Sequence, residues 1–453
     1  MLSLDKEVAN VAQLPSDQRL AGLKRIIPRK TVQAILKKTR ARQGFCKRLP
    51  GWFLVWFVIG MGLFCRDSYR QVFRWLQRRQ TAVPGRSTLC EARHSLGVAP
   101  LRWLAQEVVQ LLATPQTPNA FYRGMRLMAL DGFVLDLPDT PELARVFAKP
   151  QSGRAEGAFP QARVLALSEV GTHVIWKHQI KPLRCGEITM APCLLRHLQP
   201  GMLVLWDRGF LSYTNVAAVL AQGAHLLARI KKNMVFKPLR RFRDGSYVAK
   251  LYRSTHERNK NRNGIVVRIL KYRLKDSGRP GNGETHWLLT TLLSPTKDPA
   301  KRLIELYHQR WELEITIDEV KTHLRERPVL RSQTAAGVIQ EIEGLLLAHY
   351  VVRALMVEAA QCDGVDPRRL SFTGTLKILR CRLLECPTGE PALRQWYQDL
   401  LGEIAQERLD RRRDRVNPRV VKRKMSKWAK KRPGHRNYPQ PKSTFRQSIE
   451  MLD

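Results

Sequence analysis

Two aspartates directly follow apolar runs, a position at which the carboxylates of an α/β active site are often found. Asp131 comes after the apolar run 127–130 and before Gly132, and Asp207 comes after the apolar run 203–206. We expect both runs to be strands with the aspartates at their ends, because open α/β sheets bind ligands beyond the carboxyl ends of their strands. Two such acids on neighbouring strands could share a divalent cation.

A third acid lies on a helix predicted over residues 303–324. At 100° per residue, four polar side chains fall within a stripe about 60° wide; they are Tyr307, Arg310, Glu314 and Lys321. The stripe borders an apolar face, which we expect to anchor the helix on the core and to direct Glu314 toward the sheet. The alternative is a solvated helix face on which Arg310 and Glu314 form a surface ion pair.

Three carboxylates suit Mg²⁺, a hard ion that prefers oxygen ligands and completes its shell with water and substrate phosphates. Two such ions, with Mn²⁺ as a substitute, would activate an attacking water or 3′-OH and stabilise the leaving oxygen. Arg310 and Lys321 would bind nearby phosphates. Asp131, Asp207 and Glu314 therefore predict metal-dependent phosphoryl transfer.

Other acids and histidines near these positions offer alternatives. The rival carboxylates are Asp136, Asp139, Asp318 and Glu319. Among them we rank Asp139 highest, as a turn-capping residue before Thr140-Pro141. For His173 and His308 we expect a structural role or a phosphate contact rather than metal ligation.

The charge of the chain predicts a nucleic-acid partner. Its 453 residues include 79 Lys and Arg against 39 Asp and Glu, a formal net charge of +40. Such an excess needs a polyanion, and phosphate backbones are the commonest. The longest apolar run, 52–65, is shorter than the roughly 18 residues that span a bilayer, so we expect no membrane. The start of the chain lacks the pattern of an export signal, and the eight cysteines lack zinc-binding spacing.

The elements predicted after residue 125 alternate between strands and helices. Strands are expected at 127–130, 162–167, 173–176, 203–206 and 226–230, and helices at 191–197 and 214–221. This order suits an RNase H-like α/β core. A charged, Gly-rich segment with strand-like pieces at 265–272 and 286–292 indicates a β-rich insertion.

The remaining regions complete the expected layout. We predict a helical DNA-binding domain at 1–122, the first part of the catalytic core at 123–232, the β-rich insertion at 233–295 and the second part of the core at 296–360. C-terminal helices follow at 361–407, and a basic, disordered tail at 408–453. Within 1–122, a short helix with Arg86 and Arg93 on its surface belongs either to a helix-turn-helix or to a plain helical bundle.

The local motifs resemble those of bacterial insertion-sequence transposases of the insertion-element-four type. Their helix signature, Y-x2-R-x3-E-x6-K, is matched at every position by Tyr307, Arg310, Glu314 and Lys321. The resemblance covers roughly residues 25–380 and includes Asp131-Gly132, Gly171-Thr172-His173, the run 207–213 and Ala348-His349-Tyr350. The sequence departs from the family pattern at Phe133 and Leu143, which affects no metal carboxylate.

The resemblance implies a DNA transposase with an RNase H-like fold, whose catalytic triad corresponds to Asp131, Asp207 and Glu314. It also implies a homodimer that acts on terminal inverted repeats and target DNA by cut-and-paste chemistry, in the bacterial cytoplasm at the nucleoid. A tryptophan matching Trp287 stacks on a flipped base in related transposases, whereas composition alone favours a core tryptophan. Trp311 and Arg208, which neighbour the motifs, are further candidate DNA contacts.

Two other functions compete with this interpretation. A nuclease of the same fold would hydrolyse strands without joining them, and its phosphoryl-transfer site would look the same. A decayed element could bind DNA without catalysis, but the presence of Asp131, Asp207 and Glu314 argues against it.

Overall fold

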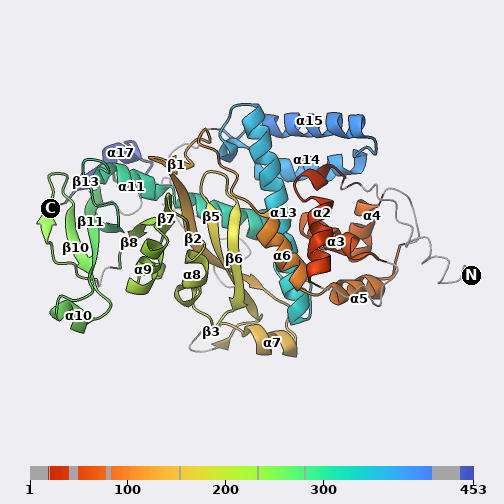
Figure 1. The fold of residues 1–453 in the computed structure, drawn as a ribbon, viewed down its shortest axis with the longest axis horizontal. Helices are drawn as coiled ribbons and strands as arrows, with labels where there is room; N and C mark the ends of the chain where they lie inside the picture. Colours follow the sequence, from red (N-terminus) through yellow and green to blue (C-terminus); the bar gives the residue numbers. More distant parts are fainter. Residues whose placement is uncertain are drawn as a thin grey trace, which may run out of the picture. The chain divides into compact units, whose positions relative to one another are not determined.

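The computed structural model describes residues 19, 21–39, 49–77, 83–152, 155–231, 234–279, 282–410 and 439–452. The chain forms two compact units. Unit 1 comprises Met1–His197 and Trp311–Arg408, and unit 2 comprises Leu198–Arg310 and Leu409–Asp453. Both units combine helices with strands, which confirms the predicted α/β class (Figure 1). The finer domain layout stays a prediction.

Unit 1 begins with short helices, as the sequence predicts. They are η1 (Ala21–Arg25), α2 (Arg29–Lys38), α3 (Gly51–Leu63), α4 (Tyr69–Leu76), α5 (Arg86–Leu96) and α6 (Ala99–Val108). Helix α3 is apolar on every side, and its residues from Phe53 onward are buried. A helix of this composition is stable in water only inside a core.

Arg93 does not lie on the surface of α5, so that prediction was wrong. Its guanidinium is buried, and it donates to Gln340 Oε1 at 3.1 Å, Ser332 Oγ at 2.7 Å and the Gly337 carbonyl at 2.9 Å. These neutral acceptors satisfy N–H donors of the buried guanidinium, and they join α5 to the start of α13 (Ala335–Cys362). Arg93 is therefore unavailable to DNA.

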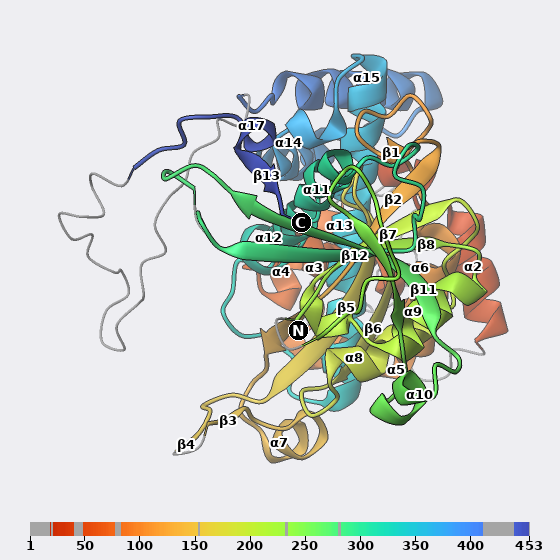
Figure 2. The same cartoon turned by 90° about the vertical axis from the view of Figure 1, so that its left-hand side faces the viewer.

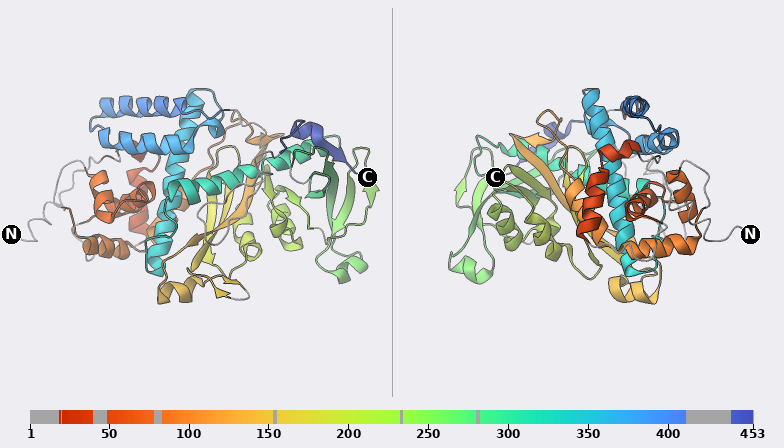
Figure 3. Two further views of the ribbon diagram at one scale, coloured as in Figure 1. Left: turned by 180° about the vertical axis from the view of Figure 1, so that it is seen from behind. Right: turned by 45° about the vertical axis from the view of Figure 1, so that its right-hand side comes forward.

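The core of unit 1 is built around α13. This helix packs against α3, α6, α14 (Phe372–Glu385) and α15 (Glu390–Gln406). Figure 3 shows α13 in cyan alongside the red and orange N-terminal helices and the blue C-terminal helices. It is long and apolar enough to cross a membrane by composition, but 83% of its most apolar window is buried in the fold. Such burial is typical of the core helix of a globular domain.

Three antiparallel strands of unit 1 lie against these helices. The central strand β5 (Gln161–Glu169) pairs with β2 (Met125–Asp136) on one side and with β6 (Ile175–Pro182) on the other, and β1 (Phe121–Tyr122) pairs with β2. β6 begins two residues later than predicted, because His173 adopts a left-handed backbone conformation with φ of 60° that ends regular strand geometry.

Other elements of unit 1 connect or flank these strands. They are α7 (Pro141–Phe147), the hairpin β3 (Gln151–Ser152) and β4 (Ala155–Glu156), α8 (Glu187–Leu195), α12 (Trp311–Asp318), a π-helix η3 (Glu319–Leu324) and η4 (Pro367–Arg369). Helix α8 packs on β5 and β6, whereas α12 packs on β2.

Unit 2 contains a mixed sheet. β7 (Met202–Trp206) runs parallel to β8 (His225–Arg229), and antiparallel pairs continue through β12 (Thr285–Thr290), β11 (Ile265–Leu274), β10 (Tyr247–Leu251) and β9 (Arg240–Arg241). The helical elements are η2 (Arg208–Phe210), α9 (Tyr213–Ala221), α10 (Thr255–Asn259) and α11 (Ala300–His308). The strand-like pieces expected between 233 and 295 are thus confirmed as strands.

Residues 445–451 are folded, which corrects the prediction of disorder for this part of the 408–453 tail. Helix α17 (Phe445–Ser448) and strand β13 (Ile449–Met451) belong to unit 2, and β13 pairs with β11; both are dark blue in Figure 2. The edge of β11, the stacking of Phe445 on His308 and the burial of Ile449 outweigh the basic composition here. Residues 411–438, where most of the basic tail falls, lie outside the described residues.

Candidate active site

The prediction that Asp131 ends a strand was wrong, because Asp131 lies in the middle of β2. The strand continues to Asp136 because residues 128–136 pair in unbroken register with β5. Side chains alternate across a strand, so Asp131 shares a face with Phe133 and Leu135, which are buried in the core that contains α13. Asp131 itself is half-buried, and its Oδ1 accepts the backbone N–H of Gly132 at 2.8 Å.

The glycine after Asp131 leaves room for the side chain of Glu187. A Cβ at Gly132 would lie 2.6 Å from the carboxyl carbon of Glu187, the first residue of α8. Arg163 of β5 holds that carboxylate at 3.1 Å. The glycine therefore leaves space for this ion pair beside β2, on the strand face opposite Asp131.

Glu314 lies on α12, which packs on β2 within unit 1. Leu313 and Thr316 are the buried residues of this short helix, and Glu314 is half-buried. Unit 1 therefore contains a helix bearing one predicted carboxylate against the strand bearing another. Lys321 follows in η3 and is also half-buried.

The helix predicted over 303–324 is divided into three elements. α11 ends at His308, Gln309 and Arg310 form a turn, α12 runs from Trp311 to Asp318, and η3 is a π-helix. The 100° periodicity of the sequence does not register this break, because the apolar positions continue across it. Tyr307 and Arg310 thus belong to unit 2, whereas Glu314 and Lys321 belong to unit 1.

Unit 2 brings Asp207, Tyr307 and Arg310 together. Asp207 directly follows β7, as predicted, and is half-buried. The Tyr307 hydroxyl donates to the carbonyl of Trp206 at 3.3 Å. Burial raises the pKa of Tyr307; Arg310 lowers this pKa and Asp207 raises it, so both charges act on the same ring. Tyr307 is therefore a neutral hydrogen-bond donor beside Asp207 at physiological pH.

The remaining predicted DNA contacts are accessible to different degrees. Arg208 is exposed, and Trp311 is 49% exposed. Trp287 lies on β12 opposite Lys271 of β11, whose Nζ is 5.4 Å from the centre of the indole ring. Trp287 is half-buried, so it is not one of the buried core residues.

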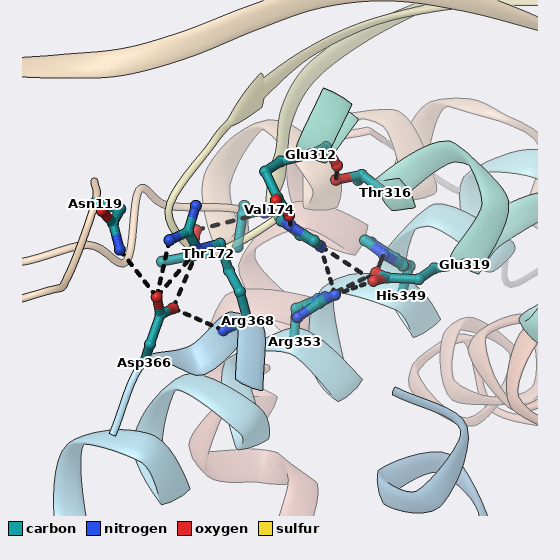
Figure 4. A network of polar contacts seen from close by, with 11 residues as sticks. Asn119, Thr172, Val174, Glu312, Thr316, Glu319, His349, Arg353, Asp366 and Arg368 are labelled. Atoms are coloured by element: carbon teal, nitrogen blue, oxygen red, sulfur yellow. Dashed lines mark hydrogen bonds and ion pairs between the residues drawn. The ribbon is translucent and has the colours of Figure 1, made fainter. Parts of the chain in front are cut away.

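A buried polar network holds the segment around Glu314 in unit 1 (Figure 4). Arg353 of α13 donates through Nε to Glu319 Oε2 at 2.8 Å and through Nη2 to Glu319 Oε1. His349 Nε2 contacts the same carboxylate at 3.0 Å, and His173 Nδ1 lies 3.1 Å from it. Burial raises the pKa of Glu319, but Arg353 and the two histidines bring it well below its ordinary value. Glu319 is therefore a buried carboxylate.

His173 connects this network to α12. His173 Nδ1 lies 3.1 Å from Glu319 Oε1 and 2.6 Å from Nη2 of Arg353. On the other side of the ring, Nε2 lies 3.0 Å from Glu312 Oε2. Glu312 is two residues from Glu314, so His173 fixes the start of the helix that bears the predicted ligand. These contacts give His173 a structural role, which is one of the two roles that the sequence predicts for it.

A second network lies close by in unit 1. Glu169 accepts from Arg126, from the Thr172 hydroxyl and from the backbone N–H groups of Leu112 and Ala113 at 3.0 and 2.9 Å. Figure 4 also shows Asp366 with Asn119 and Arg368. The motif 171–173 is thus a structural junction. No sequence pattern marks Glu312 or Arg353, whereas His349 belongs to the motif Ala348-His349-Tyr350.

The rival carboxylates are engaged elsewhere. Glu319 is enclosed in its network, Asp136 accepts from Gln161 Nε2 at 2.7 Å, and Lys149 pairs with Asp139 at 2.9 Å. Asp318 is 56% exposed beside His323, and Thr322 donates to it at 2.6 Å. His308 stacks on Phe445 with ring centres 4.4 Å apart, which gives it a packing role in unit 2.

The donor set of Asp131, Asp207 and Glu314 fits a hard divalent ion. All three are carboxylates, and each is half-buried, so an ion could reach them. Within the described part of the chain, no group of three or more His, Cys, Asp or Glu is already gathered in a way that could hold a metal ion.

Comparisons of the sequence with known proteins identify a family. A family model described as the transposase DDE domain matches residues 122–351, and one described as the insertion element 4 transposase N-terminal region matches residues 17–106. The chain is 27% identical over 398 residues to transposase InsG for insertion sequence element IS4 of Escherichia coli strain K12, covering 84% of this chain and 87% of that protein. Among solved structures, a cryo-EM structure of the piggyBac transposase synaptic complex with hairpin DNA aligns with 85% of this chain and 86% of that one, at a TM-score of 0.45 and 11% identity.

Proposed function

The chain belongs to the family of transposases with this DDE domain, and we propose that Asp131, Asp207 and Glu314 are its three metal-binding carboxylates. It is a DNA transposase, an enzyme of a family that cuts and rejoins DNA with divalent metal ions. The proposal concerns which residues perform this chemistry.

The packing of α12 on β2 supports the assignment most strongly. It gives unit 1 a half-buried Glu314 on an element that contacts the strand of the half-buried Asp131. The buried network of Glu319, Arg353 and His173 holds that element from the other end. For Asp207, support comes from its position after β7 and from the motif that follows it.

Two Mg²⁺ ions, when bound, would supply the activation of the attacking oxygen and the stabilisation of the leaving oxygen. The carboxylates of Asp131, Asp207 and Glu314 would hold these two ions. Their half-buried positions limit competition from bulk water, and the rigid strand β2 keeps Asp131 from moving during the reaction. Mn²⁺, which also favours oxygen ligands, would substitute.

Cationic and aromatic side chains bind and orient the DNA. Arg310 and Arg208 present guanidinium groups that can bind phosphate oxygens as planar forks, and Lys321 adds a point charge. Tyr307 donates a hydrogen bond beside Asp207, Trp287 stacks on a base, and the exposed Trp311 adds a further aromatic contact. These roles remain part of the proposal.

The substrates we propose are the terminal inverted repeats of the element and a target duplex, processed by cut-and-paste strand transfer. We also infer an RNase H-like catalytic core, a homodimer in the complex with two DNA ends, and action in the cytoplasm on the bacterial nucleoid. A nuclease with the same residues would release cleaved ends without joining them. A strand-transfer assay with a labelled 3′-OH end therefore separates the two activities.

The test of the assignment is the nicking of duplex DNA that carries the repeats flanking the gene. Asp131→Asn, Asp207→Asn and Glu314→Gln should each abolish Mg²⁺-dependent nicking while binding to the same DNA is retained, because each change removes a ligand charge and keeps the shape. Asp139→Asn and Asp318→Asn are the matched controls and should nick like the wild type. Substantial nicking by any of the three variants would remove that residue from the site.

A further inference from the structure

A cavity beside the edge strand of unit 1 is lined mainly by positive charge. It has a volume of about 430 Å³, more than ten times the roughly 30 Å³ share of one water molecule. Its walls come from α6, β6, α8, the two residues beyond α8 and Glu343 of α13. Four cationic side chains line it, against the single carboxylate of Glu343: Arg102, Lys177, Lys181 and Arg196.

The lining is fixed by contacts within unit 1. Glu343 of α13 is buried and holds Arg102 at 3.6 Å and His178 Nε2 at 2.9 Å. Trp176 packs edge-on against His197, with ring centres 6.5 Å apart. One carboxylate thus positions part of the wall and leaves the cavity with a net positive charge.

Three of the cations form no ion pair within the described residues: Lys177, Lys181 and Arg196. The carboxylate of Glu107 on α6 is near enough to Lys177 to raise its pKa, but burial outweighs it. Burial, followed by the charges of Lys177 and Arg196, lowers the pKa of His197, so both cations act on the same ring. Burial also lowers the pKa of Lys177. An anion in the cavity would offset the repulsion among these groups.

A polar group in the wall is also left without a partner. Gln179 Oε1 is buried and has no hydrogen-bond partner among the described residues. A buried polar atom without a partner is costly, so such atoms usually mark a missing ligand or water. Rotating the amide by 180° would present its NH₂ group instead, which can donate to an anionic oxygen.

Lysines on an edge strand also serve to prevent strand-to-strand aggregation, and β6 is the outermost strand of the unit 1 sheet. That role explains Lys177 and Lys181 on β6. It does not explain why Arg102 from α6 and Arg196 from the end of α8 line the same cavity.

We propose that this cavity binds a phosphodiester of the DNA backbone, independently of base sequence and separately from the residues assigned to catalysis. The ligand class follows from several unpaired cations, one amide and an adjoining aromatic pair around a space of this size. The inference rests on the DNA-binding function proposed above, and it adds a contact that anchors DNA to unit 1.

Cys193 provides a direct probe, because it is exposed and lines the cavity. In the full-length protein, a short duplex DNA of unrelated sequence should slow alkylation of Cys193 by a maleimide. Cys381 is exposed on α14 and serves as the internal reference, whose alkylation should change little. Equal alkylation of Cys193 with and without saturating DNA would contradict the proposal. Protection by inorganic phosphate but not by DNA would contradict the assignment to DNA.

Charge variants test the same site by binding. Lys177→Gln combined with Arg196→Gln should reduce the slope of log K against log salt by about 0.9 for each lost phosphate contact. Lys377→Gln combined with Arg394→Gln removes the same charges from exposed positions on α14 and α15 and should leave the slope unchanged. Equal slopes for wild type and the cavity variant would overturn the proposal. If the wild type itself neither binds nor nicks DNA, the proposed function fails instead.

Discussion

Arg353 and Glu319 form an ion pair inside unit 1, with side chains only 2% and 4% exposed. Two histidines also contact the Glu319 carboxylate, and one of them, His173, contacts Glu312 at the start of α12 as well. The pair therefore links the core helix α13 to the element that carries Glu314. The strength of the ion pair between Arg353 and Glu319 determines whether α12 is held rigidly.

We predict that Glu319→Gln lowers the free energy of unfolding by about 3–5 kcal/mol, because Arg353 then remains buried without its counter-charge. The exposed pair of Arg382 and Glu385 supplies the control. Glu385→Gln should cost no more than about 1 kcal/mol, as for other surface pairs. Chemical denaturation of both variants measures the two changes in the free energy of unfolding. Equal, small decreases would show that the buried pair stabilises the protein no more than a surface pair does.

The pH dependence of this contribution follows from the lowered pKa of Glu319. Its stabilisation is complete above the unfolded-state pKa, near 4.3, and is lost as the pH falls through the lower folded-state pKa. The stability gap between wild type and Glu319→Gln should therefore be constant from pH 5 to 7, a range above about 4.3, and should shrink under more acidic conditions. A gap that shrinks already near neutral pH would assign the effect to a histidine.

Asp276 fixes the C-terminal segment in unit 2. Its Oδ2 accepts from the Ser443 hydroxyl at 2.7 Å and from the backbone N–H of Ser443 at 3.0 Å. The Ser443 hydroxyl contributes most to lowering the pKa of Asp276, so these contacts persist below the usual titration range of aspartate. Gly278 is needed beside it, since a Cβ there would lie 2.0 Å from the carbonyl oxygen of Gln440.

We predict that Asp276→Ala releases α17 and β13 from β11. Amide hydrogen exchange at residues 449–451 should become several-fold faster, because local opening of the segment no longer has to break the hydrogen bonds of Asp276 and so costs less free energy. Asp399→Ala, an exposed change on α15, should leave this exchange unaltered. Unchanged exchange in Asp276→Ala would mean that β-pairing alone retains the segment.

Trp287 provides a prediction about the later steps of the reaction. If it stacks on an extruded base, Trp287→Ala forfeits roughly 1–3 kcal/mol, and hairpin formation or second-strand cleavage falls roughly ten- to hundredfold while first-strand nicking survives. Trp287→Phe should recover much of the activity, and an abasic nucleotide at the extruded position should rescue Trp287→Ala. Uniform loss of every step together with a lower melting temperature would instead assign Trp287 a packing role.

The sequence predicts most strands because apolar runs are a local signal. Asp207 lies after β7 as expected, whereas Asp131 does not end its strand, since pairing with β5 carries β2 through Gly132. The break at Gln309 and Arg310 was not predictable from a periodicity that continues across it. Each of these differences arises from tertiary pairing, which a local pattern does not record.

The burial of charged residues could not be predicted from the sequence for the same reason. Glu319 and Arg353 are residue types that usually face solvent, and only their mutual contacts and the two histidines beside them make burial favourable. The end of the chain was misjudged because its basic composition indicates disorder, while the β11 edge and the Asp276 turn that fold it lie far away in the sequence. His173 could be interpreted correctly because a single histidine near acids more often pairs with them than binds metal.

Metal-ion specificity tests the central assignment most directly. Cysteine supplies a soft sulfur ligand, which Mg²⁺ disfavours and a softer ion such as Mn²⁺ tolerates better. Asp131→Cys, Asp207→Cys and Glu314→Cys should therefore lose nicking in Mg²⁺ and regain part of it in Mn²⁺, whereas Asp139→Cys should nick in both. Nicking by all three variants in Mg²⁺ at the wild-type rate would contradict the assignment of these carboxylates as the metal ligands.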